Sequence, residues 1–341
     1  MNKTYTLQEI AVLLGAKVQG DPNCVITGIG SLEHAKPGEI SFLENPNLRP
    51  LLNDTGASAI ILKEQYATFA NKNYLIVENP YLGYSKVSVL FNDTPKVEVG
   101  IHQTAIIGKD CEIDETASIA PLCVLGNRVK IGASVRIEAG SIIGDECEIG
   151  ADSRLCANVT LYHKIKMGQR CLIHSGVVLG SDGFGNANDK GVWHKVYQLG
   201  KVVIGNDVEI GANTTVDRGA IDDTIIEDGV RLDNQIQVGH NVIIGAHTAI
   251  AGCVGIAGSA KIGKYCMIGG GVGINGHIEI ADGVIVTGAS AVGKSITKAG
   301  VYSSGFSAVP HRTWWRILAR VMSLEDLVNR VSNLENKHEH T

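Results

Sequence analysis

The chain has 341 residues and a formal net charge of −5. This length allows a large hydrophobic core, and the acidic balance argues against a general nucleic-acid binder, because such proteins present a basic surface. Glycine accounts for 41 residues and aromatic side chains for only 5% of the chain, which predicts many tight corners and few large rings. No signal-like segment and no run of 18 apolar residues occurs, so we expect a cytoplasmic protein without a membrane span.

Residues 1–98 show mixed patterning and predict a separate α/β domain. Its first helix is expected to begin near Thr6, which can cap it, and to end at Gly15, which tolerates a left-handed backbone. Short apolar runs bounded by polar residues predict buried strands, and a later stretch has helical spacing. The expected strands and second helix cover residues 58–62, 74–77 and 81–91.

A hexapeptide repeat dominates the rest of the chain. From Ile101 to Leu179 every sixth residue is aliphatic, fourteen times in succession. The period returns at Ile204, slips by four residues near Ala220, and then continues as far as Val292. Such a period is typical of a parallel β-helix, in which three hexads form one triangular coil. We therefore predict a mainly β solenoid of about ten coils over residues 99–305.

Three other features accompany the repeat. Residues 183–201 interrupt it and predict a loop leaving one corner, and loops of that length are usually functional or disordered. Residues 306–341 switch to helical spacing and predict a helical extension with an apolar stripe. Five of the eight cysteines occupy the second inward position of a hexad, where we expect them only to pack; they are Cys111, Cys123, Cys147, Cys171 and Cys266.

Two histidines of the solenoid are candidates for catalysis. His240 and His277 are 37 residues apart, two coils plus one residue. They should therefore lie on one side of the prism, about 10 Å apart along its axis. Asp233 precedes His240 by seven residues, and a carboxylate near an imidazole can fix its tautomer and favour its protonated form. That spacing corresponds to neighbouring faces of the prism, so whether Asp233 and His240 touch each other is left open at this point.

Several interrupted motifs occur in a fixed order and are more specific than the repeat. They are Ser41-Phe42, Asn45-Pro46, residues 79–82, 182–185, 215–224, 232–234, 239–241, 266–270, 274–277 and 300–305. Together they resemble the UDP-3-O-(3-hydroxyacyl)glucosamine N-acyltransferases of bacterial lipid A biosynthesis. The resemblance runs almost end to end, and the hexads alone are similar to the broader superfamily of hexapeptide-repeat acyltransferases with a left-handed parallel β-helix.

This resemblance implies a homotrimer with an active site at each subunit interface. The donor would be an (R)-3-hydroxyacyl thioester on the phosphopantetheine of acyl carrier protein. The acceptor would be the 2-amine of a UDP-glucosamine already acylated at O3. The amino-terminal domain would bind the uridine nucleotide and the carboxy-terminal helices the carrier protein, with no bound cofactor and no metal.

The resemblance also assigns roles to individual residues. His240 matches the general base, and Gly258 matches the residue whose backbone N–H faces the developing oxyanion. Asp233 is the candidate carboxylate of the catalytic group. Residues matching the substrate-binding positions are Phe42, Asn45, Asn234, His277, Ala289 and Ala291. Leu48 stands where the family has a tyrosine beside the uracil ring, and leucine lacks the π-system for stacking.

Arg312, Arg316 and Arg320 are spaced by four in the predicted carboxy-terminal helix, and no acidic residue lies between His311 and Ser323. Such spacing forms a row on one helix face. The row favours an acidic partner such as acyl carrier protein, although a merely solvated basic face has the same pattern.

Three alternatives remain open from the sequence. A coenzyme-A-dependent acyltransferase could use the same solenoid with a soluble thioester. A metal site like that of the γ-carbonic anhydrases is another possibility, because three histidines can meet between such rods. A purely structural solenoid would leave the amino-terminal motifs and the loop unexplained.

Overall fold

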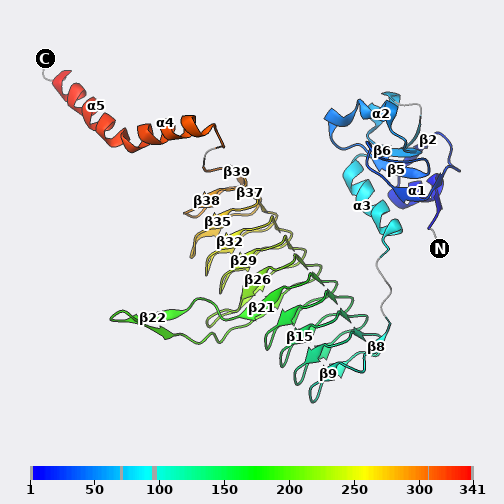
Figure 1. Cartoon of the computed structure of the whole chain (residues 1–341), viewed down its shortest axis with the longest axis horizontal. Helices are drawn as coiled ribbons and strands as arrows, with labels where there is room; N and C mark the ends of the chain where they lie inside the picture. The colour runs from blue at the N-terminus through cyan, green and yellow to red at the C-terminus, as the bar shows by residue number, and fades with distance from the viewer. Residues whose placement is uncertain (1–2, 70–71, 94–97, 306, 339–341) are drawn as a thin grey trace. The chain divides into compact units, whose positions relative to one another are not determined.

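The computed structural model describes residues 3–69, 72–93, 98–305 and 307–338. The chain divides into two compact units, Met1–Lys96 and Val97–Thr341. Figure 1 shows a small mixed unit, a long stack of short strands and two carboxy-terminal helices. The expected boundary at residue 98 lies two residues from the observed division, and residue 306, the expected start of the extension, is outside the described residues. No helix in the described part is long and apolar enough to cross a membrane.

The amino-terminal unit is a five-stranded sheet between two small cores. Apolar side chains of helices α1 (Leu7–Leu14) and α3 (Pro80–Phe91) cover one face, and α2 (Leu51–Asp54) lies with the second core on the other. The strands, in spatial order, are β2 (Lys17–Gln19), β7 (Asn73–Ile76), β6 (Ala59–Leu62), β5 (Glu39–Phe42) and β4 (Gly28–Ile29). The other elements are β1 (Tyr5–Thr6), β3 (Val25–Ile26), α1 (Leu7–Leu14), α2 (Leu51–Asp54), α3 (Pro80–Phe91) and the 3₁₀ helices Pro46–Leu48 and Glu64–Phe69.

The helix expected after Thr6 forms with both of its caps. The Thr6 hydroxyl accepts from the Glu9 backbone N–H at 3.2 Å, and the Glu9 carboxylate accepts from the Thr6 N–H at 2.7 Å. Gly15 ends the helix at φ 63°, a left-handed conformation that costs glycine little. Local signals thus fix both ends of α1.

The second unit is a parallel β-solenoid whose chain runs through three sheets in turn, here called sheets I, II and III. Sheet I contains β8 (Gly100–Ile101), β11 (Ser118–Ile119), β14 (Arg136–Ile137), β17 (Arg154–Leu155), β20 (Leu172–Ile173), β25 (Glu209–Ile210), β28 (Arg231–Leu232), β31 (Ala249–Ile250), β34 (Met267–Ile268), β37 (Val284–Val286) and β39 (Gly300–Tyr302). Sheet II contains β9 (Ile106–Ile107), β12 (Val124–Leu125), β15 (Ile142–Ile143), β18 (Thr160–Leu161), β21 (Val178–Ser181), β26 (Thr215–Asp217), β29 (Gln237–Val238), β32 (Gly255–Ile256), β35 (Gly273–Ile274) and β38 (Ala291–Val292). Sheet III contains β10 (Glu112–Ile113), β13 (Lys130–Ile131), β16 (Glu148–Ile149), β19 (Lys166–Met167), β24 (Val202–Ile204), β27 (Thr224–Ile226), β30 (Ile243–Ile244), β33 (Lys261–Ile262) and β36 (Glu279–Ile280).

The hexad predicts this architecture because each aliphatic residue stacks on its counterpart in the next coil. In sheet II, for example, Val216 pairs with Val238, Val238 with Ile256, and Ile256 with Ile274. These side chains point inward and form one continuous core. Within the described residues the three sheets have eleven, ten and nine strands, in agreement with the predicted coil number.

The cysteines of the second inward position are packing residues. Cys123, Cys147, Cys171 and Cys266 are buried in the core, and Cys111 packs at its edge. Burial raises the pKa of the Cys147 thiol to about 11, because a thiolate is poorly solvated there.

The interruption is more ordered than the loop we predicted. It leaves sheet II after β21 and forms an antiparallel hairpin of β22 (Asn186–Asp189) and β23 (Val192–Lys195), which projects from the solenoid (Figure 1). Lys190 and Gly191 make its turn at φ 50° and 90°, as a tight hairpin turn requires. Its side chains are exposed, with Trp193 at 67%.

The carboxy-terminal extension consists of α4 (His311–Met322) and α5 (Leu324–His338). The helical spacing predicted a single apolar stripe, but the helices break at Ser323, whose hydroxyl donates to the Ala319 carbonyl at 3.1 Å. Such back-bonding competes with the helical hydrogen bonds.

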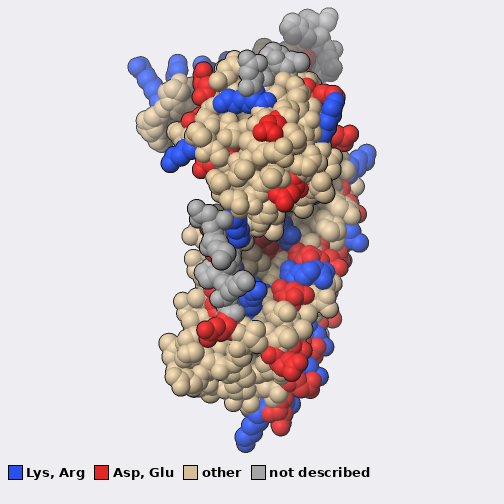
Figure 2. All heavy atoms as spheres, turned by 90° about the vertical axis from the view of Figure 1, so that its right-hand side faces the viewer, with Lys and Arg blue, Asp and Glu red and all other residues tan. Residues whose placement is uncertain are grey.

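Charged residues are dispersed over the surface. On the outer face of sheet III, Lys130 pairs with Glu112 at 3.4 Å and Lys166 with Glu148 at 3.2 Å. Figure 2 likewise shows acidic and basic side chains interspersed on the face that it presents. Exposed pairs of this kind contribute little stability and present no extended field of one sign.

Candidate active site

The two candidate histidines lie at the same corner of the prism, between sheets II and III. His240 is two residues beyond the inward Val238, and Gly258 and Gly276 hold the corresponding positions in the next two coils. His277 follows Gly276, and its N–H donates to the Gly258 carbonyl at 3.1 Å. The coil that contains Gly258 therefore lies between the coils of the two histidines, as the spacing of 37 residues predicts.

The His240 ring lies between two glycines that have no room for a side chain. A Cβ added at Gly258 would lie 2.6 Å from Nε2 of His240. A Cβ added at Gly183, at the root of the hairpin insertion, would lie 2.6 Å from Cβ of His240. Since real Cβ atoms do not approach this closely, both positions favour glycine and together confine the imidazole.

Asn241 determines which ring nitrogen of His240 carries the proton. Its Oδ1 accepts from the Ala220 N–H at 3.0 Å, and its Nδ2 donates to the Asp222 carbonyl at 2.7 Å, so the amide has only one consistent orientation. Nδ1 of His240 lies 2.9 Å from the same Oδ1, which can only accept. Nδ1 therefore carries hydrogen, and neutral His240 presents its lone pair at Nε2, toward Gly258.

Gly258 also offers a backbone donor at this place. The neighbouring N–H groups are used within the solenoid, Ala257 to the Ile274 carbonyl and Ser259 to the His240 carbonyl at 2.8 Å. The N–H of Gly258 has no backbone acceptor among the described residues. A proton acceptor and an N–H without a backbone acceptor among the described residues thus belong to neighbouring coils of this corner, and acyl transfer needs such a pair.

A buried arginine fixes the root of the insertion beside His240. Arg218 is only 2% exposed; its Nε donates to the Gly200 carbonyl at 2.7 Å, and its backbone N–H donates to the Ser181 carbonyl at 2.9 Å. Its guanidinium also lies 2.9 Å from Nε2 of His163. Arg218 therefore ties the departing and returning ends of the insertion to the corner that holds His240.

Asp233 and Asn234 lie at a different corner, between sheets I and II. The two oxygens of Asp233 accept from the backbone N–H groups of Asn234 at 2.8 Å and Gly252 at 2.9 Å. Oδ1 of Asn234 accepts from the Ala212 N–H at 2.6 Å. Sheet II separates this corner from the corner of His240, so one chain does not bring the predicted Asp233 and His240 together.

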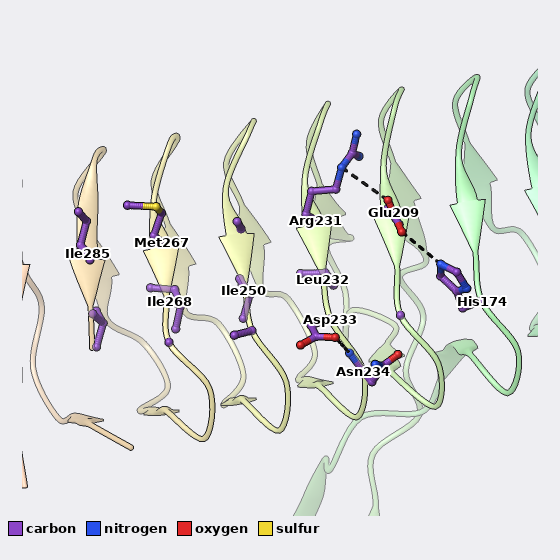
Figure 3. A pocket seen from close by; sticks show the side chains of 15 residues that line it. His174, Glu209, Arg231, Leu232, Asp233, Asn234, Ile250, Met267, Ile268 and Ile285 are labelled. Carbon is purple, nitrogen blue, oxygen red and sulfur yellow. Dashed lines mark hydrogen bonds and ion pairs between the residues drawn. The ribbon is translucent and has the colours of Figure 1, made fainter. Parts of the chain in front are cut away.

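Asp233 and Asn234 border an open groove of about 670 Å³ on sheet I. Figure 3 shows the side chains of Met267 and Ile285 in it, with a polar chain of His174, Glu209 and Arg231 farther along. His174 Nε2 lies 3.2 Å from a Glu209 oxygen, whose partner oxygen is 3.8 Å from Nε of Arg231. The groove is thus apolar at one end and charged at the other.

The remaining candidates lie in the last coils, the amino-terminal unit and α4. Ala289 is at the corner between sheets I and II with φ 57°, and Ala291 lies on the outer row of sheet II; both are exposed. Asn45 caps the helix Pro46–Leu48, its Oδ1 accepting from the Asn47 N–H at 3.0 Å. The side chains of Arg312, Arg316 and Arg320 are exposed on α4.

Phe42 has aromatic neighbours that the sequence did not indicate. Its ring stacks on Tyr84 with centroids 4.4 Å apart and planes 15° apart, and Tyr81 lies 5.9 Å away. Both tyrosines come from α3. Leu48 is 37% exposed, and Phe42 lies within an aromatic cluster formed with α3.

The comparisons with known proteins match both units. The family model for UDP-3-O-(3-hydroxymyristoyl) glucosamine N-acyltransferase, LpxD, matches residues 23–90, and the model for bacterial transferase hexapeptide repeats matches residues 122–157. A solved LpxA structure from Acinetobacter baumannii is 25% identical, covers 60% of this chain and 71% of that one, and has a TM-score of 0.46.

Two curated relatives extend over nearly the whole chain. A UDP-3-O-acylglucosamine N-acyltransferase of Pseudomonas aeruginosa is 49% identical and covers 98% of this chain and 95% of its own length. One of Coxiella burnetii is 47% identical and covers 97% of each. At this identity and coverage, the chain belongs to the UDP-3-O-acylglucosamine N-acyltransferase family.

Proposed function

We propose that this protein transfers an (R)-3-hydroxyacyl group from acyl carrier protein to the 2-amine of a UDP-3-O-acylglucosamine. The observation that supports it most directly is the position of the His240 Nε2 lone pair and the Gly258 N–H in neighbouring coils of one corner. The family relationship supplies the substrate class, since the curated relatives are named for UDP-3-O-acylglucosamine.

In the reaction, the amine nitrogen attacks the thioester carbonyl carbon, and Nε2 of His240 takes a proton from that nitrogen. The Gly258 N–H donates to the carbonyl oxygen as negative charge develops there, an interaction stronger in the transition state than in the bound substrate. The C–S bond then breaks, and the proton on Nε2 passes to the departing phosphopantetheine thiolate. The amide product and the free thiol leave His240 neutral again.

The other candidate residues would bind the substrates and the carrier. Phe42 and Asn45 would bind the uridine nucleotide, and His277 and Asn234 the sugar. In a homotrimer, the corner that bears Asp233 and the groove of sheet I can face the His240 corner of a neighbouring subunit. The exposed arginines of α4 would receive the acidic carrier, and the protein would act in the cytoplasm.

A direct assay tests the function. The purified protein is incubated with UDP-3-O-acylglucosamine and 3-hydroxyacyl carrier protein, and mass spectrometry measures the N-acylated product. Parallel reactions contain acetyl-coenzyme A as donor or a metal chelator. Product from the carrier-bound donor alone, unaffected by the chelator, is expected. Preference for acetyl-coenzyme A or loss of activity with the chelator would contradict the proposal.

We also predict the chain-length preference. Ala289 and Ala291 leave exposed space at the end of the solenoid, and each additional buried CH₂ contributes about 0.8 kcal/mol. A longer 3-hydroxyacyl donor should therefore be preferred over a shorter one. Competition between carriers loaded with different chains measures this. Ala291→Met should shift the preference to shorter chains; an unchanged preference would place the length determinant elsewhere.

A further inference from the structure

A polar network on the outer face of sheet II lies next to His240 and has no role in the scheme above. Asp217, at the end of β26, is its centre. One carboxylate oxygen accepts from the Ser181 hydroxyl at 2.8 Å, and the other accepts from Nε2 of Gln237 at 2.9 Å. Since these residues come from three successive strands, β21, β26 and β29, the carboxylate is held between its two neighbouring coils.

The strand register places this carboxylate one coil from the imidazole. Thr215 pairs with Gln237 and Val216 with Val238, so the next position aligns Asp217 with Gly239, the residue before His240. A positive charge on His240 acts to lower the pKa of the Asp217 carboxyl, against the larger effect of burial. The carboxylate is therefore positioned to act on the imidazole through space, while Asn241 holds Nδ1 directly.

The surrounding charges leave Asp217 without a permanent cationic partner. Asp182 pairs with Lys195 at 2.5 Å, and Arg218 is directed to the Gly200 carbonyl and His163. Among the described residues Asp217 forms no ion pair with a lysine or arginine. His240 in its protonated form is a cation whose charge favours the ionised form of Asp217.

Burial makes this carboxylate costly to keep ionised. Desolvation raises the pKa of Asp217, and the hydrogen bonds from Ser181 and Gln237 and the charge of His240 oppose that rise. A neutral side chain of the same size would avoid the desolvation. Ser181 and Gln237 both donate hydrogen bonds to the ionised carboxylate, which indicates that its negative charge has a functional role.

We propose that Asp217 is a positioning residue whose carboxylate stabilises the imidazolium form of His240 during acyl transfer. The inference rests on the proposed function. When Nε2 takes the amine proton as the C–N bond forms, His240 becomes a cation near Asp217. The stabilisation ends when that proton moves to the thiolate released by C–S cleavage. Aspartate has this role toward histidine in other acyl-transfer sites, although there it contacts the ring directly.

The test measures the pKa of His240 without any substrate. NMR titration of the histidine ring resonances in the full-length protein follows each imidazole, and His240→Ala identifies the signal of His240. Asp217→Asn keeps the shape and removes the charge, so the pKa of His240 should fall by about 0.5 to 1 unit. Asp152→Asn, an exposed change of the same kind in a distant coil, should leave that pKa unchanged.

Kinetics then connect the charge with catalysis. In Asp217→Asn the acidic limb of the pH profile of kcat/KM should move to lower pH by the same amount as the His240 pKa measured by NMR. The value of kcat should fall about tenfold, because a less basic imidazole is a weaker proton acceptor. KM should change little. Asp217→Ser removes the charge with a smaller side chain and should give the same shift if the asparagine variant does not fold.

Two results would overturn the inference. An unchanged His240 pKa in both folded variants would show that Asp217 has no electrostatic effect on the ring, whatever reaction the protein catalyses. A fall in kcat without any movement of the acidic limb would assign Asp217 a structural role only. Because the titration needs no substrate, its outcome is separate from that of the acyltransferase assay.

Discussion

At the residue scale, His240 is the group on which turnover should depend most. Its Nε2 lone pair is oriented by Asn241 and confined by Gly183 and Gly258. Without it the attacking amine has no positioned base, so we expect His240→Ala to lower kcat by about 10²- to 10⁴-fold. His102→Ala, an exposed histidine in the first coil, is the matched control. Steady-state kinetics check both, and more than half of the wild-type activity in His240→Ala would remove it from the mechanism.

Asp217 should also influence how stability depends on pH. Its folded-state pKa is raised above the ordinary value of 3.8, so the folded protein binds more protons than the unfolded chain between these two values. Its contribution to the free energy of unfolding therefore decreases as pH rises through that window. Asp217→Asn removes this effect.

Denaturant unfolding of both proteins at several pH values from below 3.8 to neutrality measures the difference. The free energy of unfolding of the variant minus that of wild type should become more positive as pH rises and then level off. A difference that is constant or declines with pH would show that the carboxylate is not penalised by burial.

The sequence could predict where some candidate residues lie but not the contacts of others. The shared corner of His240 and His277 was predictable because the hexad period fixes which corner each residue occupies. Asn241, Asp217 and Arg218 were missed, since their roles depend on hydrogen bonds to residues one or more coils away. The buried arginine within the motif of residues 215–224 was the available signal, because arginine is rarely buried without a specific partner.

At the scale of the element, the stacking of coils explains why the site requires glycine at position 258. Gly258 lies in the coil above His240, and the Cβ of Gly258→Ala would meet Nε2 at 2.6 Å. The backbone of Gly258 is outside the left-handed region, so the fold should tolerate alanine. The imidazole must then move, and we expect kcat to fall about 10²-fold or more.

Gly28→Ala is a suitable comparison, because its Cβ would lie 3.7 Å from Cγ of Glu39, an ordinary contact. Melting temperature and kcat should stay near wild type in this variant, whereas Gly258→Ala should lose only kcat. If Gly258→Ala keeps full activity, neither the ring position nor the neighbouring N–H is important for turnover.

The hexapeptide repeat explains why the solenoid was more predictable than the insertion. A hexad repeats its inward residue in every coil, so local pattern and long-range packing agree throughout the core. The hairpin β22–β23 buries little of its surface, and its pairing depends on one tight turn near Gly191. The break between α4 and α5 was also missed, because a serine hydroxyl interrupts an otherwise continuous helical pattern.

At the scale of the whole molecule, the proposed reaction uses a carrier protein that would deliver the thioester to the solenoid. The exposed arginines of α4 (Arg312, Arg316 and Arg320) are spaced by four. Nη2 of Arg316 donates to the Thr313 hydroxyl at 3.1 Å. A row of this kind attracts an acidic partner by long-range electrostatics, which salt weakens. For wild type, we therefore expect the rate with the carrier-bound donor to fall as ionic strength rises.

Reversal of these charges tests the docking surface separately from the chemistry. The triple change Arg312→Glu, Arg316→Glu and Arg320→Glu should raise KM for acyl carrier protein about tenfold or more and make the rate less sensitive to salt. The rate with a small acyl-pantetheine thioester should stay unchanged, because that donor reaches His240 and Gly258 without α4. Lys130→Glu with Lys166→Glu and Lys261→Glu, exposed on strands of sheet III, makes the same change of net charge away from α4. Equal losses with both donors would instead indicate damage to the active site, and equal effects of the two sets of changes would place carrier binding outside α4.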